Sequence, residues 1–82
     1  MRNKGKSKKM EKNSLIGAAW CAPCGRVKRF LDNRGVGYRY VDIDTEEGLE
    51  LARELGVRSV PAMVVDGNVI VGEPNIMEAF GE

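Results

Sequence analysis

The sequence contains no histidine and only two cysteines among its 82 residues. A closed zinc site takes four ligands, usually cysteine and histidine, so a single copy of this chain could complete one only with carboxylates. Nor can two cysteines this close in sequence form a disulfide framework, because a structural bridge gains stability by closing a long loop. The cysteines therefore indicate redox or metal chemistry rather than a role in holding the fold together.

Long apolar runs are also missing, and none approaches the ~20 residues that a membrane-spanning helix needs. The apolar run at residues 15–22 follows a basic stretch, as the core of a signal peptide does, but cleavage there would cut into or remove the cysteine pair. We interpret this run as a buried strand instead. The sequence thus predicts no membrane partner and a cytoplasmic location, where a lone pair of cysteines is seldom structural.

Positive charge is scarce outside the first twelve residues. Residues 1–12 carry six lysines and arginines against one glutamate, whereas residues 13–82 carry seven against eleven acidic side chains. Because they lack apolar periodicity, residues 1–12 are predicted to be a disordered basic tail. A nucleic-acid-binding arm is the alternative, but no aromatic side chains are interleaved with the charges, so nucleic acid is not an expected partner. Residues 13–82 show no linker or repeat and are predicted to be one domain, in a monomer.

Both cysteines and the only tryptophan lie together in the motif Trp20-Cys21-Ala22-Pro23-Cys24. The motif stands between a strand-like run and a helix-like one, so the first turn of a helix brings the two thiols close enough for a disulfide. Pro23 fits this turn, where its missing N–H is harmless. The partial positive charge of the helix N-terminus favours a thiolate at Cys21, the form that attacks disulfides. Dithiol–disulfide exchange is therefore the leading hypothesis.

The two cysteines are predicted to divide this work. Cys21, at the exposed tip of the helix, is the expected nucleophile, and Cys24, one turn further on the apolar face, is the expected resolving thiol. Half of a zinc site is the competing interpretation, in a non-catalytic metal-carrying or binding module. Trp20 could be a core residue, but its place beside Cys21 favours a flat apolar shield over the sulfur and a contact with substrate.

Periodicity along the chain predicts four strands and three helices. A strand, a helix and a strand in succession should give a parallel pair with a right-handed crossover, and Asp66-Gly67-Asn68 predicts a hairpin turn. The expected order is β-α-β-α-β-β-α, an α/β fold with a four-stranded mixed sheet and helices on both faces. The strands are expected at Leu15–Ala19, Tyr38–Ile43, Ala62–Val65 and Val69–Val71, and the helices at Cys21–Asn33, between Thr45 and Gly56, and around Pro74.

Two motifs in this order resemble those of the thioredoxins. Trp20–Cys24 is similar to the thioredoxin active site, with Ala22 where thioredoxins usually have glycine, and Gly56–Val65 is similar to the segment that carries their cis-proline. The resemblance covers residues 13–82 and identifies the chain as a member of the thioredoxin/glutaredoxin superfamily. The size is that of the glutaredoxins and of the small glutaredoxin-like redoxins linked to thioredoxin reductase. The resemblance implies a minimal thioredoxin fold, with a cis bond before Pro61 next to the disulfide.

The resemblance also implies an activity and its partners. It implies a dithiol–disulfide oxidoreductase that reduces protein disulfides, is recharged by a thioredoxin-reductase-type enzyme, and needs no cofactor or bound metal. A glutathione-dependent glutaredoxin is the alternative, but Glu73 stands in the segment where glutaredoxins hold glutathione, and its charge would oppose the carboxylates of glutathione. The residues expected to contact substrate are Trp20, Ala22, Pro23, Val60 and Pro61, with the backbone of Val60 pairing with an extended segment.

Two departures from the thioredoxins concern proton transfer. The buried aspartate that thioredoxins place near their second cysteine falls on Leu15, and the lysine of their second core strand falls on Tyr40. The resemblance therefore predicts that the charged pair beneath Cys24 is missing.

Overall fold

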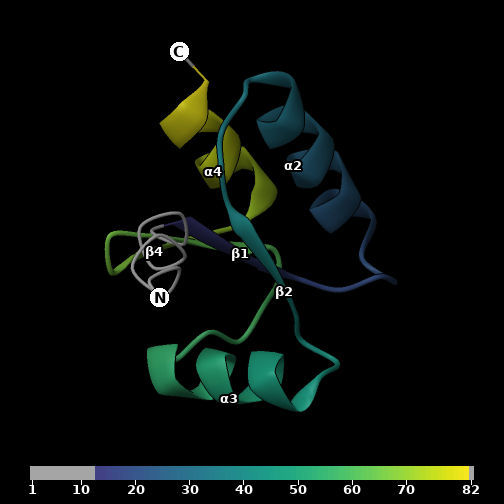
Figure 1. Ribbon diagram of the computed structural model, residues 1–82, viewed down its shortest axis with the longest axis vertical. Coiled ribbons are helices and arrows are strands. Elements are labelled where there is room, and N and C mark those ends of the chain that lie inside the picture. The colour runs from purple at the N-terminus through teal and green to yellow at the C-terminus, as the bar shows by residue number, and fades with distance from the viewer. Residues whose placement is uncertain (1–12, 82) are drawn as a thin grey trace, which may run out of the picture.

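The computed structural model of the chain describes residues 13–81, which form four strands and three helices (Figure 1). The elements follow in the predicted order β-α-β-α-β-β-α. Residues 1–12, which the sequence predicts to be a tail, lie outside the described residues. The elements are β1 Asn13–Gly17, α2 Ala22–Asn33, β2 Arg39–Asp42, α3 Glu46–Leu55, β3 Ala62–Val65, β4 Asn68–Val71 and α4 Glu73–Phe80.

The strands form one mixed sheet in the order β2-β1-β3-β4. β1 pairs in parallel with β2, as predicted for a β-α-β unit, and antiparallel with β3, whose hairpin partner is β4. Leu15 in β1 lies opposite Tyr40 on one side and Met63 on the other. β1 is thus the strand that joins the two halves of the sheet, and the segment with the cysteines follows directly after it.

Helices cover both faces of this sheet, as expected: α2 and α4 lie side by side on one face, and α3 lies on the other (Figure 1). Successive side chains of a strand point to opposite faces, so the apolar run in β1 contributes to both cores. Leu15 belongs to the cluster on the side of α2 and α4, together with Val27, Leu31, Met63 and Ile76. Ile16 belongs to the cluster on the side of α3, together with Val41 and Ala62, and Leu51 and Leu55 pack against it.

Short-range signals set the ends of the elements. The Gly48 N–H donates to the Thr45 hydroxyl at 3.0 Å, which caps α3 at its start, and Gly56 ends α3 with a left-handed φ of 73°. Asp66 and Gly67 have φ values of 51° and 87°, so both are left-handed, as in a type I′ turn between β3 and β4. Each of these ends was predicted from the sequence.

The first strand differs from its predicted range, Leu15–Ala19. β1 begins at Asn13 because its two polar residues still pair with the end of β3, a contact that apolar patterning does not reveal. It ends at Gly17, and the Cys21 N–H donates to the Ala18 carbonyl at 3.2 Å. The last residues of the predicted strand therefore form the turn that leads into α2.

Gly48 marks a close approach that the sequence did not reveal. A Cβ atom at this position would lie 1.9 Å from the carbonyl oxygen of Asp42, so the backbone of α3 touches the backbone at the end of β2. A side chain there would force the two elements apart. The glycine therefore determines how closely α3 lies against β2.

Candidate active site

The two cysteines lie at the N-terminal end of α2 and are joined in a disulfide, with their Cα atoms 5.2 Å apart. Cys21 is the N-cap residue of the helix, and its side chain is 9% exposed. Cys24 lies one turn inside and is 1% exposed. Between them, Ala22 is exposed and Pro23 is half-buried in the first turn. Cys24 is the more deeply buried of the two, as predicted, but Cys21 is itself largely buried rather than exposed.

The sulfur of Cys21 occupies the position of a capping side chain. The Cys24 N–H points at Cys21 Sγ with an N···S distance of 3.2 Å, and Cys21 has the extended backbone typical of an N-cap. Unpaired N–H groups at this helix end carry partial positive charge. Negative charge on Cys21 Sγ is therefore stabilised once the disulfide is reduced, and the thiolate is the nucleophilic form of cysteine.

A loop from the second half of the chain lies against the disulfide. The Val60–Pro61 peptide bond is cis, as predicted, and the Val60 carbonyl oxygen lies 3.9 Å from Cys21 Sγ. The Gly72 N–H donates to the carbonyl of the buried Pro61 at 2.9 Å, which connects the loop to the start of α4. Within residues 13–81, the Val60 N–H has no hydrogen-bond partner. A backbone donor is therefore left free in the loop beside the disulfide.

Trp20 is not a core residue, because its side chain is 69% exposed. Its indole Nε1–H donates to the Asp44 carboxylate at 3.0 Å, and the Asp44 N–H donates to the Asp42 carboxylate at 2.8 Å. These hydrogen bonds hold the indole at the turn between β2 and α3. The apolar side chains that pack against the buried cluster of the cysteines and Ala18 are Ile43 and Val60.

Among residues 13–81, no charged pair lies beneath Cys24. Leu15 is fully buried, and the described residues include no buried polar or charged side chain. A Cβ atom on Gly17 would come within 3.1 Å of the Tyr40 hydroxyl and within 3.2 Å of Cys24 Cβ. Because Gly17 has no side chain, the phenol of Tyr40 can lie close to Cys24. Tyr40 stands where the thioredoxins have a lysine.

The phenol of Tyr40 is held in its neutral form. Burial raises the pKa of Tyr40, and the negative charges of Asp42 and Asp44 raise it further. Lys28 Nζ lies 4.3 Å from the centroid of the Tyr40 ring, over its face. The group next to Cys24 is therefore an uncharged O–H at neutral pH.

An ion pair that the sequence did not predict joins α2 to α4. The Arg26 guanidinium donates twice to the Glu73 carboxylate, at 2.7 and 3.0 Å. The hydrogen bond and the opposite charges raise the pKa of Arg26 and lower the pKa of Glu73. The two residues lie 47 positions apart, so only the packing of the helices brings them together. The charge that was expected to oppose glutathione is thus already paired.

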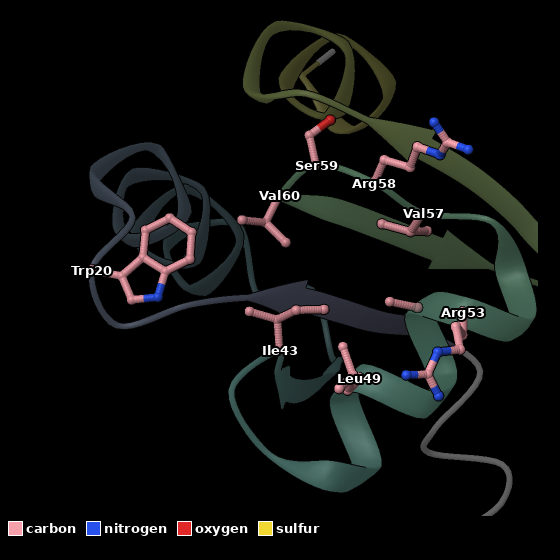
Figure 2. A pocket seen from close by; sticks show the side chains of 9 residues that line it. Trp20, Ile43, Leu49, Arg53, Val57, Arg58, Ser59 and Val60 are labelled. Atoms are coloured by element: carbon pink, nitrogen blue, oxygen red, sulfur yellow. The ribbon is translucent and has the colours of Figure 1, made fainter.

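A groove begins beside Trp20 and runs along α3, with a volume of about 520 Å³ (Figure 2). Arg53 and Arg58 lie at the end away from Trp20 (Figure 2). This groove was not predicted from the sequence, because its walls come from segments that meet only in the fold. Its apolar walls are formed by Ile43, Leu49, Ala52, Val57 and Val60.

Two further features concern metal-binding clusters and membrane-spanning helices. Within residues 13–81, no group of three or more histidine, cysteine or acidic side chains lies close enough to hold a metal ion. No helix in this range is both long enough and apolar enough to cross a bilayer.

Sequence comparison connects this geometry to known proteins. The sequence profile of the glutaredoxin family matches residues 8–70. The chain is 36% identical over 63 residues to a glutaredoxin of Ricinus communis, and 34% identical over 59 residues to a thioredoxin of Listeria monocytogenes. These matches cover 71% and 65% of this chain, but only 62% and 57% of the two relatives.

Solved structures share the fold. A mutant of a thioredoxin-like protein has a TM-score of 0.73 at 27% identity, over 82% of this chain and 91% of that chain. Buckwheat glutaredoxin in complex with glutathione has a TM-score of 0.68 at 26% identity, over 90% of this chain and 74% of that chain. The chain is therefore a protein of the thioredoxin-fold class, with a CxxC pair at disulfide distance. Within this class, the chain belongs to the glutaredoxin family.

Proposed function

We propose that this protein reduces disulfide bonds in other proteins, as a dithiol carrier of electrons. The observation that carries the proposal is the position of Cys21, which is the N-cap residue of α2 and is bonded to the more deeply buried Cys24. After reduction, the sulfur at the helix end is the less buried of the two and is stabilised as a thiolate, and the other is protected. A two-step exchange needs this pair of properties.

The exchange transfers two electrons from the protein to its substrate. In the first step, the Cys21 thiolate attacks one sulfur of the substrate disulfide, and the other substrate sulfur leaves as a thiolate that takes a proton from solvent. In the second step, Cys24 loses its proton to solvent and attacks Cys21 Sγ. This closes the Cys21–Cys24 disulfide, and the second substrate sulfur leaves as a thiolate that takes a proton from solvent.

We assign substrate contact to the residues around Cys21. The free Val60 N–H and the Val60 carbonyl can pair with an extended substrate segment, as an added strand would. Trp20 and Ala22 are exposed at the point of attack, which a contact with substrate needs. The proposed contact residues are Trp20, Ala22, Pro23, Val60 and Pro61.

We further propose that a thioredoxin-reductase-type enzyme returns the electrons. Glutathione binding needs cations for the carboxylates of the tripeptide, and Arg26 already uses its hydrogen bonds on Glu73. Glutathione is the second candidate, because the chain belongs to the glutaredoxin family and the buckwheat glutaredoxin structure contains glutathione.

Two supplies of electrons separate these candidates. The oxidised protein is mixed with insulin and NADPH, together with either thioredoxin reductase or glutathione and glutathione reductase, and NADPH consumption is followed. We expect turnover with thioredoxin reductase and little with glutathione. Turnover with glutathione alone would favour the second candidate. If the chemically reduced protein failed to reduce insulin at all, the proposed disulfide reductase activity would be wrong.

Glu73→Gln sharpens this comparison, because it removes the negative charge and releases Arg26. If the ion pair limits the use of glutathione, the variant should turn over faster with glutathione than the wild type does. Glu78→Gln is the matched control, since Glu78 is exposed on the same helix. Equal glutathione rates in all three proteins would show that the pair does not govern the choice of donor.

We expect the protein to act as a monomer in the cytoplasm. A reducing compartment keeps a dithiol of this kind available for attack. Sedimentation at several concentrations would check the monomer, and fractionation of the source cells would check the location.

A further inference from the structure

Beyond Trp20 and Val60, the side chains that line the groove along α3 have no role in the exchange described so far. Val60 belongs both to this groove and to the surroundings of the disulfide, where its carbonyl oxygen lies 3.9 Å from Cys21 Sγ. A substrate whose sulfur is bonded to Cys21 therefore has the groove directly beside it. Two exposed apolar side chains, Trp20 and Leu49, line the groove and are available to a ligand.

The far end of the groove is positively charged. Neither Arg53 nor Arg58 has an ion-pair partner among the described residues, whereas Arg26 and Arg39 are paired with Glu73 and Glu47. Residues 13–82 carry more acidic than basic side chains, so these arginines are a local exception on an acidic domain. Unpaired guanidinium groups beside an apolar wall suit a ligand that offers both an apolar side chain and a carboxylate.

We propose that this groove binds the substrate polypeptide next to its reactive disulfide and selects an extended segment with an apolar residue near the cysteine and an acidic residue further along. The inference rests on the proposed disulfide reductase function. The backbone of the segment pairs with Val60, its apolar side chain packs against Leu49 and Val57, and its carboxylate reaches the arginines.

The two arginines do not contribute equally. Arg53 also borders a neighbouring hollow that it shares with Glu46 and Glu50, whose negative charges offset its own. Arg58 lines the apolar groove but not this hollow. Arg58 is therefore the main contact for the carboxylate, and Arg53 is the lesser one.

Single-turnover reduction of designed peptides tests the selection. Each peptide carries a cysteine in a disulfide with a coloured aromatic thiol, a leucine nearby, and a glutamate, glutamine or lysine at successive positions further along. The protein is reduced with dithiothreitol and desalted, so that no electron donor takes part. We expect the glutamate peptide to react about fivefold faster than the lysine peptide at the best position, in line with exposed ion pairs. Added salt should reduce this ratio.

Variants assign the selection to the groove. Arg58→Gln should remove most of the preference for glutamate over lysine, and Arg53→Gln should remove less. Arg29→Gln is the matched control, because Arg29 is exposed on α2 and does not line the groove. It should keep both the preference and the wild-type rate with a small aromatic disulfide.

The outcomes distinguish this inference from the function on which it rests. If the small disulfide and all peptides are reduced at rates that do not depend on peptide charge, the groove does not select acidic segments, although the reductase function stands. A preference that survives in both arginine variants would also overturn the inference. If the reduced wild type reacts with neither peptides nor the small disulfide, the proposed function itself is wrong.

Discussion

At the scale of single residues, two identical side chains differ because of where they lie. Cys21 is the N-cap residue of a helix and is 9% exposed, and Cys24 lies one turn inside and is 1% exposed. In the proposed exchange, burial and the helix end, rather than the type of residue, decide which sulfur attacks and which one resolves. The sequence predicted this difference because both sulfurs lie within one short motif with its own helix signal.

Serine variants of the two cysteines should fail in different ways. Cys21→Ser should abolish disulfide reduction, because the attacking thiolate is gone. Cys24→Ser should still attack and should accumulate mixed disulfides with substrate, because no second thiol releases the product. Mass spectrometry after incubation with an oxidised protein substrate measures both. Mixed disulfides that form with Cys21→Ser rather than with Cys24→Ser would reverse the assignment.

Other contacts of single residues could not be predicted from the sequence. Trp20 was placed beside the sulfur, but nothing in the chain indicated that Asp44 would hold its indole. Arg26 and Glu73 lie on two separate helices, and only the packing of α2 against α4 makes them a pair. Contacts between distant segments depend on tertiary distances that periodicity does not contain.

Tyr38 should make stability sensitive to high pH. Its hydroxyl donates to the Asp32 carboxylate at 2.9 Å, and burial, followed by this bond and the charge of Asp32, raises the pKa of Tyr38 to about 12. In the unfolded chain this pKa is about 10, so the contribution to stability is complete below about pH 10 and is lost as the pH rises through the folded value. Tyr38→Phe should therefore flatten the loss of unfolding free energy across this range.

Urea unfolding at a series of pH values measures this effect. Tyr40, whose pKa is also raised, remains in the variant and should account for the part of the slope that is left. An absorbance titration of the wild type that showed both tyrosines ionising near pH 10, the ordinary range, would contradict the prediction.

At the scale of elements, periodicity and caps predicted the order of helices and strands. Thr45 and Gly56 mark the two ends of α3, and the alternation around Tyr40 and Val41 marks β2. β1 was misplaced because Asn13 and Ser14 join the sheet through their backbones, which their polar side chains conceal. The distance between elements was not predictable either. Gly48 is an example, because a glycine inside a helix does not indicate which backbone segment packs against it.

Alanine at two helical glycines should have opposite effects. At Gly25 a Cβ atom would meet nothing within 4 Å, so Gly25→Ala should stabilise α2 by about 1 kcal/mol through helix propensity. At Gly48 it would meet the Asp42 carbonyl at 1.9 Å, so Gly48→Ala should destabilise the protein by about 1–3 kcal/mol despite the same propensity gain. Urea unfolding of both variants provides the comparison. Stabilisation by both would show that α3 lies further from β2 than described.

At the scale of the whole molecule, the site is assembled from four separate parts of the chain. The cysteine motif follows β1, Asp44 follows β2, Val60 precedes β3, and Gly72 is the N-cap residue of α4. The sequence predicted the fold because two of these parts resemble known motifs in a recognisable order. The groove had no such motif, since its walls are ordinary apolar residues that become a surface only when α3 packs beside the Val60 loop.

Removal of residues 1–9 should leave the domain intact. The clusters of the described core are drawn from residues 15–80, so the deletion removes none of their side chains. We expect unchanged exchange rates and an unfolding free energy within about 1 kcal/mol of the full chain, a margin that is large for a small domain. A larger loss in urea unfolding would show that these residues contribute to the fold.

The hydrogen bond from Cys24 N–H to Cys21 Sγ makes helix stability and redox equilibrium parts of one thermodynamic cycle. A side-chain acceptor at an N-cap contributes about 1 kcal/mol, and a charged acceptor binds its donor more strongly. If the cap stabilises the reduced protein more than the oxidised protein, the difference in free energy raises the reduction potential by an equivalent amount. A better cap therefore makes a weaker reductant, and for this two-electron couple about 1.4 kcal/mol of folding stability corresponds to about 30 mV of potential.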